Sequence, residues 1–190
     1  RMRGAVLILT IAILGVRSHA QPPVVTVTRD DTILDRSCRV RIPAGLILAD
    51  AAGDGVIRIG ADDVTIEFEP GSELRGAPFV APGPKLRGTG IAVAGHRNVT
   101  LRGARLRGYA LGIDAAEAAG LLIEDADLRE IRRDLLESTA EEEAAADVVD
   151  PIRGDTREWL LLPGAAIAIR DSNDVTIRRA CAVLRGHLWS

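Results

Sequence analysis

The sequence predicts an all-β chain folded as a right-handed parallel β-helix, a solenoid in which successive turns of about 22 residues stack on one another. Two observations favour this fold. A unit of two short alternating strands joined by a polar turn recurs along the chain, and Leu101 to Ile123 is a step of 22 residues between equivalent positions. Strands so short and so far apart do not pair as local hairpins, but they can stack in register as parallel strands. The copies are GVIRIGADDVTIEF (55–68), GIAVAGHRNVTLRG (90–103), LGIDAAEAAGLLIED (111–125) and AIAIRDSNDVTIRR (166–179).

Alternation within each copy assigns the faces of the predicted strands, because successive side chains of a strand point to opposite sides. The inward positions of the first strands are Ile57, Ile59, Ile91, Val93, Leu111, Ile113, Ile167 and Ile169. Those of the second strands are Val64, Ile66, Val99, Leu101, Leu121, Ile123, Val175 and Ile177. A third strand, which gives the triangular cross-section of a right-handed β-helix, is marked by Leu74, Leu106, Leu128 and Leu184.

The turn before each second strand carries a recurring type of residue. The column consists of Asp63, Asn98, Gly120 and Asp174. These residues tolerate a left-handed backbone or form Asx turns, as a sharp corner repeated in every layer requires. In this repeat, and above all in the motif [Asp/Asn]-Val-Thr-[Ile/Leu], about residues 25–185 resemble the right-handed parallel β-helix proteins of the pectate-lyase-like superfamily, including exported bacterial repeat proteins.

The first 20 residues have the layout of a secretory signal peptide. Arg1 and Arg3 precede an apolar run that is short for a membrane span, and small residues stand before the expected cleavage position after Ala20. An uncleaved N-terminal anchor is the alternative. We therefore expect a protein that is secreted, periplasmic or on the cell surface, with no stable membrane span after cleavage.

The remaining chain divides into a cap and a stack. Residues 21–54 are the predicted N-terminal cap, because an open β-helix end exposes strand edges and must be covered. Residues 55–190 are the predicted rungs, with insertions at about 77–88 and 130–163. No capping element follows the last copy, so we expect a C-terminally truncated fragment with an incomplete β-helix.

The net charge and the residue composition limit the classes of partner that we expect. Loss of the three arginines in residues 1–20 reduces the 24 basic side chains to 21 against 27 acidic ones, a formal net charge of −6. An acidic exported protein is a poor nucleic-acid binder. His96 and His187 are isolated, so we predict no metal site and no evident cofactor. Calcium is the one ion to consider, but the acidic segment 150–159 lacks a recognisable ligand spacing.

The two cysteines fall in the first and last predicted layers. Layers about 4.8 Å apart place Cys38 and Cys181 roughly 19 Å from one another, beyond the ~7 Å limit between the Cα atoms of a disulfide. Both are therefore predicted to be small buried residues.

Outward charges form two different columns. The second strands carry Glu67, Arg102, Glu124 and Arg178, which alternate in sign and predict a self-neutralised ladder of ion pairs. The corner after the third strand carries Arg75, Arg107, Arg129 and Arg185 without an acid between them. Like charges directly opposite one another are destabilising, so this second column predicts an anionic partner. The candidates are Glu141–Glu143 of the same chain or the carboxylate or sulfate groups of an acidic polysaccharide.

Both insertions leave from that corner and predict a notch in the surface. Its floor would hold Arg107 and Tyr109, and its walls would be supplied by Lys85, Phe79 and Trp159. The long insertion begins with a pattern that fits a helix face, and it is either a helix packed on the flank or a lid over the substrate. The apolar residues of that face are Leu128, Ile131, Leu135 and Leu136.

Catalytic residues are less evident. The resemblance implies clustered aspartates for calcium with a basic residue, or paired aspartates that act as acid and base. Asp114 and Asp171 in neighbouring layers are the best carboxylate pair, though a weak one. The outward side chains of the first strands are small at Ala92, Ala94, Gly112 and Ala168, which suits either a sugar chain lying flat or a loop covering the strip.

Two functions therefore stay open. The leading hypothesis is an exported β-helix domain that binds a polysaccharide, preferably anionic, through Arg75, Arg107, Arg129, Arg185, Tyr109 and Trp159. If the protein is an enzyme, the resemblance implies a polysaccharide lyase or a glycoside hydrolase. The alternative is a non-catalytic structural or cell-surface module with no small-molecule site.

Overall fold

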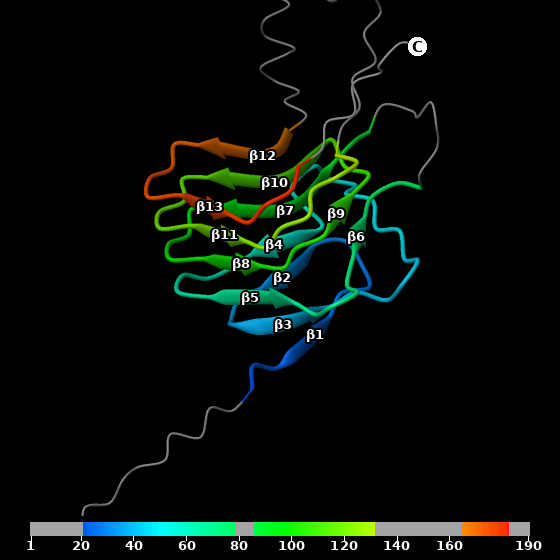
Figure 1. Cartoon of the computed structure of the whole chain (residues 1–190), viewed down its shortest axis with the longest axis horizontal. Coiled ribbons are helices and arrows are strands. Elements are labelled where there is room, and N and C mark those ends of the chain that lie inside the picture. Colours follow the sequence, from blue (N-terminus) through cyan, green and yellow to red (C-terminus); the bar gives the residue numbers. More distant parts are fainter. Residues whose placement is uncertain (1–20, 79–85, 132–164, 183–190) are drawn as a thin grey trace, which may run out of the picture.

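The computed structural model describes residues 21–78, 86–131 and 165–182, and within these ranges the chain is all-β and contains no helix. Figure 1 shows the strands stacked one above another, from β1 at one end to β12 and β13 at the other. Every strand pairing is parallel. The insertion segments 79–85 and 132–164, the expected signal peptide and residues 183–190 lie outside the described residues.

The strands of the described residues form three sheets. The first has the order β1 (Val24–Thr26), β3 (Cys38–Arg41), β5 (Thr65–Phe68), β8 (Thr100–Arg102), β11 (Leu122–Glu124) and β13 (Thr176–Arg178). The second has the order β2 (Thr32–Leu34), β4 (Ile57–Ile59), β7 (Thr89–Ala94), β10 (Leu111–Ala116) and β12 (Ala165–Arg170). The third pairs β6 (Leu74–Arg75) with β9 (Leu106–Arg107). Strand order follows chain order in each sheet, so every return of the chain adds the next strand.

The core consists of the alternating apolar positions. All predicted inward residues of the first three copies are buried, as are Leu74, Leu106 and Leu128 on the third side. Ile66, Leu101, Ile123 and Ile177 lie opposite one another in consecutive strands. The fourth copy differs, because Ile169 and Ile177 are 42% and 43% exposed. They belong to β12 and β13, the last described strands of their sheets, and no further described layer covers them.

Register corrects the predicted alignment of the third copy. Leu111 and Ile113 were aligned with Ile91 and Val93, but the structure pairs Ile113 with Ile91 and Ala115 with Val93. A slip of two residues keeps every side chain on its own face, so the burial prediction survives the error. Asp127 pairs with Cys181, and Leu184, predicted opposite Leu128, lies outside the described residues.

The predicted corner column adopts the expected backbone. Asp63, Asn98, Gly120 and Asp174 have φ values of 58°, 54°, 67° and 54°. This is the left-handed region, which glycine, asparagine and aspartate enter at the smallest steric cost. The prediction from residue type is therefore confirmed in all four layers.

The segment expected to be the cap contributes β1, β2 and β3, which continue the first two sheets. Cys38 in β3 is buried, as predicted. The prediction that Cys181 is buried is wrong, because it is exposed and bridges only Asp127 among the described residues. Both thiols are free.

Candidate functional site

The arginine column is partly in the predicted register. Arg75 and Arg107 lie directly opposite one another on β6 and β9. Arg129 follows in the next layer, where Asp127 bridges Arg105. Arg185 lies outside the described residues.

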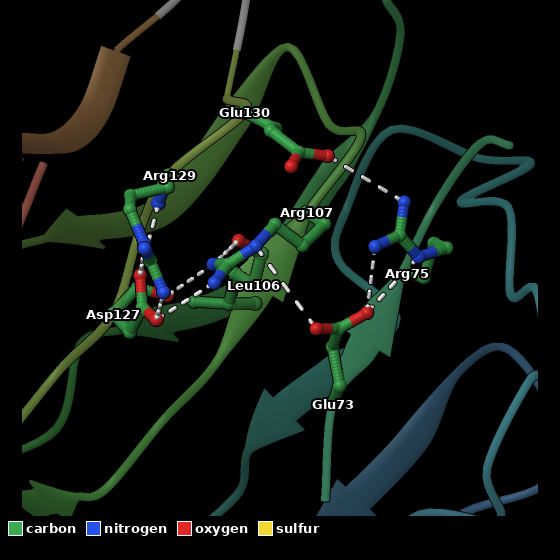
Figure 2. A network of polar contacts seen from close by, with 7 residues as sticks. All are labelled: Glu73, Arg75, Leu106, Arg107, Asp127, Arg129 and Glu130. Atoms are coloured by element: carbon green, nitrogen blue, oxygen red, sulfur yellow. Dashed lines mark hydrogen bonds and ion pairs between the residues drawn. The ribbon is translucent and has the colours of Figure 1, made fainter. Parts of the chain in front are cut away.

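The expectation that this column lacks acidic neighbours is wrong. Asp127 lies between two of the arginines and accepts from both: Nη2 of Arg107 is 2.7 Å and Nη2 of Arg129 is 2.6 Å from its Oδ2 (Figure 2). The Nε of Arg129 also donates to Oδ1 of Asp127 over 2.8 Å. One carboxylate therefore neutralises much of the repulsion between two layers.

The third arginine is paired in the same way. Nη2 of Arg75 lies 2.8 Å from Oε1 of Glu73, and Nη1 of Arg75 lies 3.6 Å from Oε2 of Glu130. The other oxygen of Glu73 is 4.0 Å from Nε of Arg107. We call this set the arginine–acid network, three arginines and three acids with no net formal charge: Glu73, Arg75, Arg107, Asp127, Arg129 and Glu130.

A sequence signal for the network exists but lies in a neighbouring column. Glu73 and Asp127 each stand two residues before an arginine of the set. Residues two apart on a strand share a face, so each acid lies on the same face as its arginine, two residues before it. Reading only the residue directly above and below each arginine therefore missed Glu73 and Asp127.

Arg107 is the buried member of the network. Its side chain is only 7% exposed, and its Nη1 donates to the carbonyl oxygens of Leu106 and Asp127 over 2.8 and 2.9 Å. Nη2 is used by the Asp127 carboxylate. The prediction that Arg107 forms the open floor of a notch is wrong, because protein acceptors already surround it.

Tyr109 is the second residue predicted for that floor, and it is fully buried. Its hydroxyl donates to the carbonyl oxygen of Leu48 over 2.7 Å. Its ring packs against Gly76, where a Cβ atom would lie 2.5 Å from Cε1 of the tyrosine. Burial, followed by the nearby charges of Asp30 and Asp50, raises the pKa of Tyr109. Tyr109 is therefore a core residue, and its predicted exposure is wrong.

Asp127 is held in its charged form by the network. Hydrogen bonds from Arg129 and, secondly, from Arg107 lower the pKa of this carboxyl far below its usual range, against the opposing effect of partial burial. A carboxyl whose pKa is lower in the folded than in the unfolded chain stabilises the fold above the unfolded value of about 3.9. That contribution is lost as the pH falls below this value.

We expect Asp127→Asn to lower the free energy of unfolding at pH 7, because the variant loses the charge that Arg107 and Arg129 share. The difference from the parent protein should shrink as the pH falls from about 5 to 2, since acid protonates this carboxyl in the unfolded chain before it does so in the folded chain and so cancels its contribution to stability. Urea unfolding at several pH values measures this. Glu67→Gln, which removes an exposed carboxylate without a described ion pair, is the matched control. A difference that stays constant with pH contradicts the proposed role of Asp127.

The second charge column forms the predicted ladder only in part. Glu124 is buried between Arg102 and Arg178, whose nitrogens lie 2.9 and 2.8 Å from its oxygens, and Arg179 also pairs with it. Hydrogen bonding by Arg102, ahead of the other causes, lowers the pKa of Glu124. Glu67 lies opposite Arg102 in register, but no ion pair joins them in the described structure.

The two aspartates of the weak catalytic pair are not opposite one another, because Asp114 lies opposite Ala168, three residues before Asp171. Both oxygens of Asp114 accept from Nη2 of Arg170, over 2.8 and 2.6 Å. Asp171 is an exposed turn residue with φ of 47°. The arrangement thus gives Asp114 a cationic partner where an acid–base pair would need a second carboxyl group.

The predicted strip of small side chains is interrupted in register, because Asp114 lies opposite both Ala92 and Ala168. Ala92 is covered, because a Cβ atom on Gly55 would lie 2.9 Å from Cβ of Ala92. Gly112 is buried, with Ile131 nearby, whereas Ala94 is exposed. The loop that covers Ala92 is organised by a residue the sequence reading missed: Asp50 accepts from the backbone N–H groups of Gly53, Gly55 and Thr89. The Asp-x-x-Gly spacing of residues 50–53 is the signal that could have found it.

Lys85, Phe79, Trp159 and Glu141–Glu143 lie outside the described residues, as does the acidic segment 150–159. In the described ranges no group of three or more His, Cys, Asp or Glu is arranged to hold a metal ion. No helix among those residues could span a membrane. Comparison with family models, curated proteins and solved structures gives no significant match.

Proposed function

We propose that this chain is a right-handed parallel β-helix module and that its described part is a non-catalytic structural scaffold. Parallel sheets in which strand order follows chain order support the solenoid, as does a corner that repeats with the same backbone in four layers. Its proposed location is outside the cytoplasm, as a secreted, periplasmic or cell-surface protein.

The observation that carries the scaffold function is the neutrality of the arginine–acid network. An anion-binding surface needs guanidinium groups whose donors are not already used. Arg107 instead donates to two backbone carbonyls and a carboxylate, and Arg75 and Arg129 are each paired with acids of the same chain. The network therefore holds adjacent layers together without an external ligand.

Polysaccharide binding is the second candidate, and one feature favours it. The outer face of β7, β10 and β12 carries small side chains at Ala94, Ala116 and Ala168, with the Asp114–Arg170 ion pair beside them. A flat surface of this kind can accommodate a sugar chain lying along the sheet. The aromatic side chains of the described residues, Phe68 and Tyr109, are buried and supply no stacking platform for a sugar. We therefore rank this candidate second.

Binding and cleavage assays separate the two functions. The full chain is tested against polygalacturonate, alginate and a sulfated glycan at physiological salt, by affinity electrophoresis and by ultraviolet absorbance of the unsaturated product of a lyase. The scaffold proposal predicts neither saturable binding nor new absorbance. Glycoside hydrolysis is followed in parallel by the release of reducing ends, which we also expect to be absent.

Three variants identify the surface if binding is seen. Saturable binding that Arg129→Ala abolishes and Arg178→Ala leaves intact would overturn the scaffold proposal and restore the arginine column as the site. Binding that Ala94→Gln abolishes, with both arginine variants unaffected, would also overturn it and support the flat face of β7, β10 and β12.

A further inference from the structure

One asparagine of the chain belongs to a tripeptide whose polar side chains lie on the outside of the stack. Asn98-Val99-Thr100 has the pattern Asn-x-Thr of an acceptor for N-linked glycosylation. Val99 and Leu101 are buried, so the side chain of Thr100 between them is on the outer side. Asn98 is exposed, and Thr100 is half-buried. Asn173, the second asparagine of the chain, is followed by Asp and Val and lacks the pattern.

Asn98 lies at a corner with space beside its amide group. Its φ of 54° turns the chain between β7 and β8, and Figure 1 shows this turn on the same side of the stack as the turn between β10 and β11. In the preceding layer, Oδ1 of Asp63 accepts from Nδ2 of Asn98 over 2.8 Å. In the next layer lies Gly120, where a Cβ atom would be 2.7 Å from Oδ1 of Asn98. The absence of a side chain at Gly120 therefore leaves room next to the amide.

We propose that Asn98 is a site of N-linked glycosylation, with an oligosaccharide carried on a lipid diphosphate as the donor. The bond between the anomeric carbon of the sugar and the diphosphate oxygen breaks, and a bond forms from that carbon to Nδ2 of Asn98. The proton lost by Nδ2 leaves with the lipid diphosphate. The modified amide keeps one N–H group, which is enough for a hydrogen bond to Asp63.

This inference goes beyond the scaffold function and rests on the proposed location outside the cytoplasm. Acceptors of this pattern are modified in surface loops of secreted proteins, and the corner at Asn98 is such a surface turn. The network that carries the scaffold function contains neither Asn98 nor Thr100, so the two proposals are tested separately.

The repeat provides matched variants for the test. Asp63-Val64-Thr65 and Asp174-Val175-Thr176 occupy the equivalent corners, with φ values of 58° and 54° for the two aspartates. Aspartate therefore fits this backbone, and Asn98→Asp removes only the acceptor nitrogen. Thr100→Val removes the hydroxyl, keeps a β-branched residue in the strand and leaves Asn98 in place. Thr100→Ser restores a hydroxyl and is the conservative control.

The test is cell-free translation of the full chain in the presence of secretory microsomes. We expect the translocated chain to gain one glycan that peptide N-glycosidase removes, leaving an aspartate at position 98 that mass spectrometry of the peptides locates. Asn98→Asp and Thr100→Val should lose the glycan, and Thr100→Ser should retain it. A second preparation carries an established secretory leader ahead of the full chain, so that the site is tested whether or not the first 20 residues direct translocation.

The outcomes separate the site from the location. Chains that are translocated but unmodified at Asn98 in both preparations would overturn the proposal, and so would a glycan that persists in Asn98→Asp or in Thr100→Val. A glycan that appears only with the added leader supports Asn98 as the acceptor and contradicts the proposed export of the chain by its own first residues. A glycan in both preparations supports both.

Discussion

Tyr109→Ala is expected to lower the free energy of unfolding by about 3–5 kcal/mol, the range for removing a large aromatic side chain from a core. The ring is fully buried and lies in a space left by the absence of a side chain at Gly76. Its hydroxyl also closes a hydrogen bond to the carbonyl of Leu48, a residue 61 positions away in the chain. The substitution therefore removes both a volume and a link between distant segments. Urea unfolding followed by circular dichroism measures the loss.

Tyr109→Phe separates these two contributions. The ring stays and only the hydroxyl is removed, which leaves the buried carbonyl of Leu48 without this donor. We expect the free energy of unfolding to fall by about 1–3 kcal/mol, the range for leaving a buried polar group without a hydrogen bond. If Tyr109→Ala were no more destabilising than an average surface substitution, Tyr109 would not be the core residue described above, and its predicted place in a surface notch would become tenable again.

Arg107→Ala is expected to have the second largest effect of the substitutions proposed for this chain. We expect it to lower the free energy of unfolding by roughly 3 kcal/mol, near the lower end of the range for breaking a buried ion pair. The substitution leaves the carbonyls of Leu106 and Asp127 without their guanidinium donor and removes one of the two cations on the Asp127 carboxylate. The expected loss of stability stays at the lower end of that range because Arg129 continues to pair with Asp127. Equilibrium unfolding in urea at pH 7 tests it.

Arg129→Ala is the matched control for Arg107→Ala. Both arginines pair with the same carboxylate, but Arg129 is 53% exposed and solvent screens its interaction. We therefore expect a clearly smaller loss of stability than for Arg107→Ala. Equal losses would show that burial does not distinguish the two arginines. Arg107→Lys should not restore stability fully, because one ammonium group cannot reproduce the planar fork that reaches two carbonyls and a carboxylate.

The arginine–acid network also explains how a column of like charges can exist in a stacked sheet. Arg75 and Arg107 lie directly opposite one another, an arrangement that is unfavourable by itself. Glu73 reaches both arginines from a position two residues before Arg75. The repulsion along the column is thus offset by acids that stand two residues before its arginines, and the layers are joined by charge as well as by the apolar core.

Much of the fold was predictable because its signals are local. Alternation identified Ile66, Leu101 and Ile123 as core residues, since the side of a strand on which a residue lies depends only on its position within that strand. Residue type predicted the left-handed corners at Asn98 and Asp174, because the steric cost of that backbone is a property of the residue itself. Neither prediction required knowledge of which strands are neighbours.

The candidate site was predicted less well because the contacts of its side chains depend on which strands lie side by side and in what register. Arg107 was expected to be an exposed ligand-binding residue, yet it is buried by contacts with Leu106 and Asp127. Tyr109 was expected in a notch, yet it fills the space beside Gly76. A flexible arginine reaches across layers, and whether it meets an acid or solvent depends on register and on the direction of the side chain.

The sequence by itself determined that the chain is built from short alternating strands, which residues face the core and where the corners turn. These properties follow from the period-two geometry of a strand and from the steric limits of single residues. Only the tertiary structure decided the two-residue register of Ile113 against Ile91, the pairing of Asp127 with Arg107 and Arg129, and the burial of Tyr109. A slip of two residues leaves every face unchanged but gives every charge a new neighbour, so the pattern that specifies the core cannot also specify the ion pairs.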